Sequence, residues 1–193
     1  MNWAATFDGI LALIALALTL QAPRSLPALR LGSWLLACAA LLGALRFSDL
    51  WPQPSLHQFF SMLGAGVGLP LLAVTLAMPD SAVSLQRRFS WIYGVALSVV
   101  CILVTLVAQI KLWPSVCALL SAVVILAAGV RRKDGQVAVA GLLMLLALLA
   151  FAGKVQTESL RPGEFLHIGL SLCLLTLWRW SNRFAQSEAL PTD

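Results

Sequence analysis

The amino-acid sequence predicts an all-α protein, a polytopic bundle of seven transmembrane helices, and three observations support this fold class. Hydrophobic residues make up 60% of the chain and charged residues only 11%, whereas a soluble domain carries about 25% charged residues. Seven apolar stretches follow one another along the 193 residues, and roughly 20 residues are needed for a helix to cross a bilayer. Nearly all charged side chains lie between these stretches.

The expected helices are separated by short segments that are richer in polar residues and proline. In chain order they are Trp3–Leu20, Leu31–Phe47, His57–Met78, Trp91–Ile110, Pro114–Val130, Val137–Lys154 and Glu164–Trp180. Short connections make helices that are neighbours in sequence pack antiparallel. We therefore expect a single transmembrane domain over residues 1–183, followed by a short polar cytoplasmic tail over residues 184–193.

Several of these stretches carry local signals. Residues 1–7 contain no Lys or Arg, so the charged start of a signal peptide is missing and we expect the first helix to be retained. In the third stretch, Gly64 and Gly68 form a small-xxx-small pair that permits close helix packing. Pro70 removes a backbone donor there, which predicts a kink. At the start of the fifth, Pro114 suits the first helical turn.

The loop charges predict the orientation, because basic residues gather on the cytoplasmic side of a membrane protein. Nine of the thirteen basic residues fall on the side of the carboxyl terminus: Arg24, Arg30, Arg87, Arg88, Arg131, Arg132, Lys133, Arg179 and Arg183. The other four fall on the side of the amino terminus: Arg46, Lys111, Lys154 and Arg161. We therefore expect a multi-pass protein of the bacterial inner membrane with its amino terminus outside and its carboxyl terminus in the cytoplasm.

The composition also limits the classes of partner that the protein can bind. The net charge of +5 is scattered over loops, without the basic stripe and interleaved aromatic residues of a nucleic-acid-binding protein. We expect membrane lipids as partners and no nucleic acid, and we leave open a homo-oligomer or a larger membrane complex. The four cysteines lie in apolar stretches without CxxC spacing, so packing is their expected role.

Ionisable residues inside apolar spans are candidates for function, because they are costly to bury in a membrane. On the predicted outer side these are Asp8 in the first helix, Asp49 after the second, and His167 in the seventh. His57 and Ser61 open the third helix and share one face. Histidines and carboxylates that converge can bind a divalent metal or form an acid–base pair. We take His57, His167, Asp49 and Asp8 as candidate metal ligands, and Ser61 and Asp49 as candidate catalytic residues.

A structural role explains part of the same set, since polar residues are common at helix ends. Glu164 is placed to cap the seventh helix, because carboxylates favour the first turn. Arg46 and Asp49 are spaced to form a simple ion pair. Both interpretations stay open at this point.

The pattern resembles the CREST superfamily, which includes the alkaline ceramidases and relatives of the progestin and adipoQ receptors. Members of that group carry a Ser-xxx-His on an early helix, an acidic residue and a His-xxx-His on the seventh helix. Here the early element reads His57-Gln-Phe-Phe-Ser61, in reverse order, and the last reads Glu164-Phe-Leu-His167-Ile-Gly-Leu-Ser171 with a serine in place of the second histidine. The resemblance implies hydrolysis of a lipid amide by bound zinc, with Asp49 or Asp8 supplying the acid.

Two classes of function follow from these residues. The first is a membrane-embedded, zinc-dependent lipid hydrolase, in which His57, His167 and Asp49 hold a metal that activates water and Ser61 orients the water or the oxyanion. The alternative is a transporter or binding protein, in which the glycine-rich third helix and the outer polar residues form a vestibule for a small solute or a lipid. Haem ligation by the two histidines and a non-enzymatic accessory subunit are further interpretations.

Overall fold

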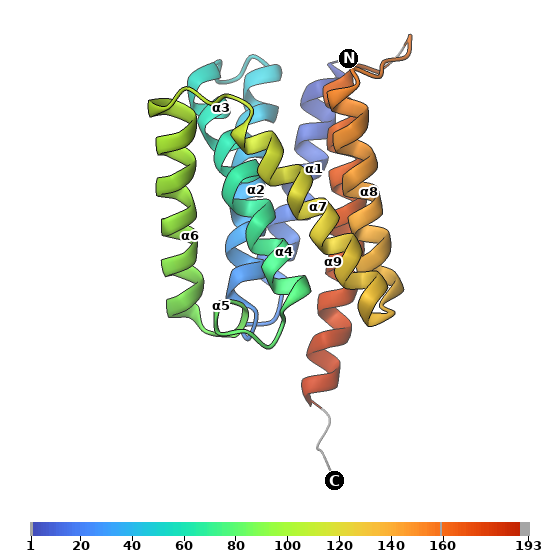
Figure 1. Cartoon of the computed structure of the whole chain (residues 1–193). Helices are drawn as coiled ribbons and strands as arrows, with labels where there is room; N and C mark the ends of the chain where they lie inside the picture. The colour runs from blue at the N-terminus through green and yellow to red at the C-terminus, as the bar shows by residue number, and fades with distance from the viewer. Residues whose placement is uncertain (1, 159, 190–193) are drawn as a thin grey trace.

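The computed structural model describes residues 2–158 and 160–189, and within them the chain forms helices and no strand (Figure 1). The elements are α1 (Trp3–Gln21), α2 (Pro27–Phe47), α3 (Pro54–Leu63), η1 (Gly64–Gly68), α4 (Leu69–Ala77), α5 (Ala82–Leu85), α6 (Arg87–Ile102), η2 (Leu103–Val107), α7 (Trp113–Arg132), α8 (Gly135–Ala152) and α9 (Pro162–Ala189). The segments η1 and η2 are π-helical turns within longer helices. The predicted all-α class is therefore confirmed.

Six helical segments in the described part of the chain are long and apolar enough to cross a membrane. They are Trp3–Gln21, Pro27–Phe47, Pro54–Ala77, Arg87–Val107, Trp113–Arg132 and Gly135–Ala152. The last helix, α9, is the longest with 28 residues, but it is less apolar and does not belong to these six. The chain is thus compatible with a multi-pass integral membrane protein.

Several helices begin earlier than the sequence analysis placed them. The α2 helix starts at Pro27 and α3 at Pro54, because a proline in the first turn gives up no helical hydrogen bond and has its φ already set. The α6 helix starts at Arg87, and α9 continues to Ala189, past the predicted end of the transmembrane domain. Residues 190–193 of the predicted tail lie outside the described residues.

The helices run between two ends of one bundle (Figure 1). The amino end, as we call it, holds the start of α1 and the loops that follow α2, η2 and α8. The carboxyl end holds the loops that follow α1, α4 and α7, together with the end of α9. The two groups of basic residues consequently lie at opposite ends of the bundle. The group of nine lies at the carboxyl end and the group of four at the amino end.

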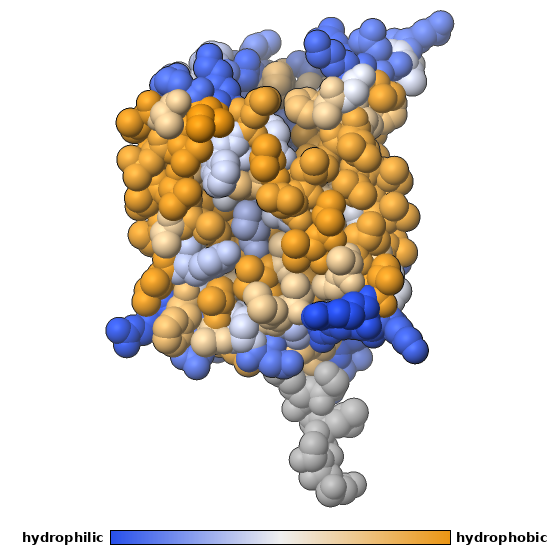
Figure 2. Space-filling view, in the orientation of Figure 1, coloured by the Kyte–Doolittle hydropathy of each residue, from blue (hydrophilic) through white to orange (hydrophobic). Residues whose placement is uncertain are grey.

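A broad, mostly apolar belt lies between the two hydrophilic ends (Figure 2). Large aliphatic side chains in it are strongly exposed, for example Leu13 at 70% and Leu20 at 67%. Exposed apolar patches of this extent mark contact with a membrane or another protein. The belt therefore supports burial of the bundle in lipid.

The third apolar stretch, for which a kink is predicted, contains the π-helical turn η1. It ends just before Pro70, which cannot donate a backbone hydrogen bond, and the N–H of Leu69 reaches back five residues to the carbonyl of Gly64. Gly68 lies against α2, because a Cβ on Gly32 would lie 2.7 Å from the carbonyl oxygen of Gly68. The glycines therefore allow the close helix packing that their spacing predicted.

Candidate functional site

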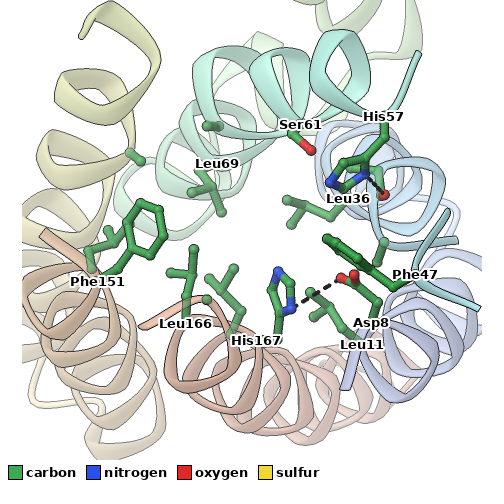
Figure 3. A pocket seen from close by; sticks show the side chains of 18 residues that line it. Asp8, Leu11, Leu36, Phe47, His57, Ser61, Leu69, Phe151, Leu166 and His167 are labelled. Atoms are coloured by element: carbon green, nitrogen blue, oxygen red, sulfur yellow. Dashed lines mark hydrogen bonds and ion pairs between the residues drawn. The ribbon is translucent and has the colours of Figure 1, made fainter. Parts of the chain in front are cut away.

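A cavity of about 340 Å³ opens near the amino end of the bundle (Figure 3). Its walls come from both halves of the chain and are mostly apolar, with Leu11, Leu36, Phe47, Leu69, Phe151 and Leu166 among the lining residues. Four polar side chains interrupt this lining: Asp8, His57, Ser61 and His167. An apolar pocket with a few converging polar groups, at about 300 to 1,000 Å³, is the usual form of a small-molecule site.

Asp8 and His167 form the polar centre of the cavity wall. They meet where α1 packs against α9, and Nδ1 of His167 lies 3.1 Å from Oδ1 of Asp8. The Asp8 side chain is only 1% exposed, and that of His167 is 20% exposed. The two groups are at ion-pair distance, but Nδ1 of His167 and Oδ2 of Asp8 complete no hydrogen bond among the described residues.

Unpaired buried polar atoms are rare and call for an explanation. Here both atoms belong to residues that line a cavity. Both atoms are buried at the contact between the two side chains, where Nδ1 of His167 faces the Asp8 carboxylate. The other nitrogen of His167 points into the cavity (Figure 3), so it is the atom of this pair that a polar group in the cavity would meet.

His57 approaches the cavity from α3. Its Nδ1 lies 3.2 Å from the carbonyl oxygen of Ala39, and its ring packs edge-on to Phe47 with the centroids 5.8 Å apart. These two contacts orient the imidazole. The rings of His57 and His167 both turn a free nitrogen toward the cavity, and Ser61 points its hydroxyl into the same space one turn after His57 (Figure 3).

Gly43, on α2, leaves space for the side chains of both Asp8 and His57. A Cβ at this position would lie 2.4 Å from Oδ2 of Asp8 and 2.9 Å from Cε1 of His57. Any side chain here would therefore displace the carboxylate, the imidazole or both. Gly43 is not among the residues predicted for the site, although Ala39 and Gly43 are a small-xxx-small pair on one helix face, a pattern that indicates close packing.

Asp49 does not line the cavity. The α2 helix ends at Phe47, and Asp49 follows in an exposed turn with a φ of 59°. Arg46 does not pair with it, and its guanidinium instead lies 5.1 Å from the centre of the Phe47 ring. Glu164 acts as the cap expected of it, because its Oε2 accepts a 2.7 Å hydrogen bond from the N–H of Arg161.

A zinc site of the predicted kind is not assembled from these residues. A catalytic zinc usually has three protein ligands and one water, and the described residues contain no group of three or more His, Cys, Asp or Glu side chains that could hold a metal. His57 and His167 face the cavity, whereas Asp8 faces Nδ1 of His167 and Asp49 lies outside. The zinc site stays a prediction, and no chemical step below depends on it.

The chemistry available in the cavity is that of an acid beside a base. A carboxylate next to one ring nitrogen of a histidine orients the imidazole and stabilises its protonated form, while the other nitrogen can take a proton from a bound molecule. No known protein family, no curated protein and no solved structure matches the chain. The function is therefore inferred from the site itself.

We predict that Gly43→Ala displaces Asp8 from His167. The added methyl group occupies the space of the carboxylate, so the ring nitrogens of His167 change their surroundings. The ¹⁵N spectrum of the two imidazoles reports this directly, and the His57→Gln variant assigns the two signals. Gly163→Ala is the control, because Gly163 lines the same cavity and has open space around it. An unchanged His167 signal in Gly43→Ala would contradict the packing described here.

Proposed function

We propose that the chain is a multi-pass protein of the bacterial inner membrane with seven spans, in which α9 is the seventh. The length of α9, 28 residues, is sufficient to cross the roughly 30 Å of hydrocarbon. Nine basic residues at the carboxyl end against four at the amino end support a cytoplasmic carboxyl terminus. In this orientation the cavity opens near the outer surface.

We further propose that the cavity binds an amphipathic lipid and hydrolyses an ester or amide bond in it. The observation that supports this most is the buried Asp8 carboxylate beside His167 on the wall of an otherwise apolar pocket. The apolar lining suits an acyl chain, and the polar side chains on the wall suit the polar group that the chain carries. The resemblance to the CREST superfamily, itself a proposal, agrees with this class of reaction.

The proposed reaction uses His167 as general base. Its cavity-facing nitrogen takes a proton from a water molecule, whose oxygen forms a bond to the carbonyl carbon of the substrate. The resulting imidazolium is stabilised by the Asp8 carboxylate. The bond from that carbon to the leaving oxygen or nitrogen then breaks, and the imidazolium returns its proton to the leaving group. The products are a carboxylic acid and an alcohol or amine.

Ser61 and His57 have supporting roles in this scheme. Both face the cavity (Figure 3), and the Ser61 hydroxyl can donate to the oxyanion that develops on the substrate carbonyl. Because Nδ1–H of the neutral His57 ring donates to the carbonyl oxygen of Ala39, its cavity-facing nitrogen can accept a hydrogen bond from the substrate. The contact of His57 with Ala39 holds its ring for that purpose. Asp49 has no role in this scheme, and transport, haem ligation and an accessory role stay predictions.

The test is hydrolysis of 4-nitrophenyl octanoate by the purified protein in detergent, followed by the release of 4-nitrophenolate. We predict that Asp8→Asn and His167→Gln each lower kcat by roughly a hundredfold or more, because general-base catalysis usually accelerates a reaction by at least that factor. Asp80→Asn is the matched control, since Asp80 is an exposed aspartate at the carboxyl end. If neither cavity variant differs from the wild type, the proposed reaction is wrong.

The proposed orientation has its own test. In a variant with the four cysteines replaced by alanine, we predict that Asp49→Cys reacts with a membrane-impermeant maleimide on intact cells and that Asp80→Cys does not. Both aspartates are exposed and lie in loops at opposite ends of the bundle. Labelling after permeabilisation shows that both thiols are reactive. Protection of Asp49→Cys with labelling of Asp80→Cys would reverse the orientation.

A further inference from the structure

A second hollow lies at the carboxyl end of the bundle, far from the cavity described above. It is a groove of about 630 Å³ along α1, α2 and α6, and its polar lining consists of Arg24, Arg30, Arg87 and Thr19. Trp34 and Trp91 also line it and are about half exposed, at 46% and 50%. Tryptophan favours the level of the lipid headgroups, so this groove lies where a headgroup would.

The three arginines of this groove have no anionic partner within the described chain. The two ion pairs formed by the described residues join His167 to Asp8 and Arg183 to Asp134. Arg30 is held in place because its Nε–H donates a 2.9 Å hydrogen bond to the carbonyl oxygen of Thr19 at the end of α1. That contact leaves the two terminal nitrogens of its guanidinium available. Guanidinium groups grouped in this way favour a phosphate, which they can bind through paired hydrogen bonds.

Two apolar grooves continue from this basic one, and Trp34 lines all three. One, of about 370 Å³, lies between α1 and α2, with Gly9, Leu13 and Leu41 among its lining residues. The other, of about 100 Å³, lies between α2 and α6, with Leu35, Val95 and Ser98 among its lining residues. A cationic groove that branches into two apolar grooves matches a molecule with one anionic head and two hydrocarbon chains.

We propose that this surface binds one anionic diacyl phospholipid. Its phosphate lies among Arg24, Arg30 and Arg87, and its acyl chains lie in the two grooves that start at Trp34. Basic pockets between transmembrane helices are a recurrent form of anionic lipid site. The proposal stands independently of the hydrolytic cavity, since the two sites share no lining residue.

The charge requirement is tested by native mass spectrometry of delipidated protein with added phosphatidylglycerol or phosphatidylcholine. We expect the wild type to retain phosphatidylglycerol preferentially. The triple variant Arg24→Gln/Arg30→Gln/Arg87→Gln should lose roughly a hundredfold in affinity, at about fivefold for each arginine. The matched control is Arg88→Gln/Arg131→Gln/Arg179→Gln, which removes the same charge from exposed positions at the same end and should keep the preference.

Each result of this comparison decides the proposal. Equal losses in the two triple variants would show attraction by diffuse surface charge and overturn a specific site. No preference in the wild type would overturn it as well. Inorganic phosphate is added alone in a further arm, and tight retention of phosphate without lipid would assign the arginines to a free anion instead.

The acyl grooves are tested by Gly9→Phe. A side chain at Gly9 meets no atom within 4 Å at its Cβ, so the ring can fill the groove between α1 and α2 without disturbing the helices. We expect retention of diacyl phosphatidylglycerol to fall by roughly tenfold, as expected when several methylene groups lose their contacts. Gly135→Phe is the control, because Gly135 also has open space around it and lines none of the grooves. Unchanged retention in Gly9→Phe would overturn the placement of the acyl chain.

Discussion

Asp8 is an acid placed within an apolar helix, and its carboxylate is 1% exposed in the contact between α1 and α9. A charged group in such surroundings needs a compensating partner, and His167 is the group within ion-pair distance. Gly43 has no side chain, so the Asp8 carboxylate and the His57 ring can both lie against it. The contact between Asp8 and His167 therefore lies where α1, α2 and α9 meet, on the wall of the cavity.

The bundle has different chemistry at its two ends. At the amino end, the polar side chains of Asp8, His57 and His167 face a cavity that several helices enclose. At the carboxyl end, three arginines line a groove that shares Trp34 with two apolar grooves. The first arrangement suits a molecule that enters the protein, and the second suits a lipid that stays in its leaflet.

Much of this could be predicted from the sequence. Continuous hydrophobic stretches of membrane length indicate helices because a helix satisfies its own backbone hydrogen bonds within one segment in lipid, and the depth of a residue follows from its position in the stretch. That reasoning brought Asp8, His57 and His167 to one end. The helix starts at Pro27 and Pro54 were missed, although proline in a first turn is a recognised signal.

Which residues line the cavity depends also on how each helix is rotated about its axis and on where it ends. The depth of a residue in the membrane determines neither. Asp49 is at the right level, but α2 ends two residues before it and the chain turns away from the cavity. Gly43 has no polar atom, so a search for reactive side chains passes over it. Trp180, the last residue of the seventh predicted stretch, is 5% exposed and packs in the core.

The central claim is that Asp8 and His167 interact across the α1–α9 contact. A double-mutant cycle with Asp8→Asn, His167→Gln and the combined variant measures that interaction as a coupling free energy of unfolding. We predict a coupling of about 1 to 3 kcal/mol, because each single variant leaves the other buried group without its partner. Effects that add to within about 0.3 kcal/mol would mean that the two side chains do not interact, and the account of the cavity would then be wrong.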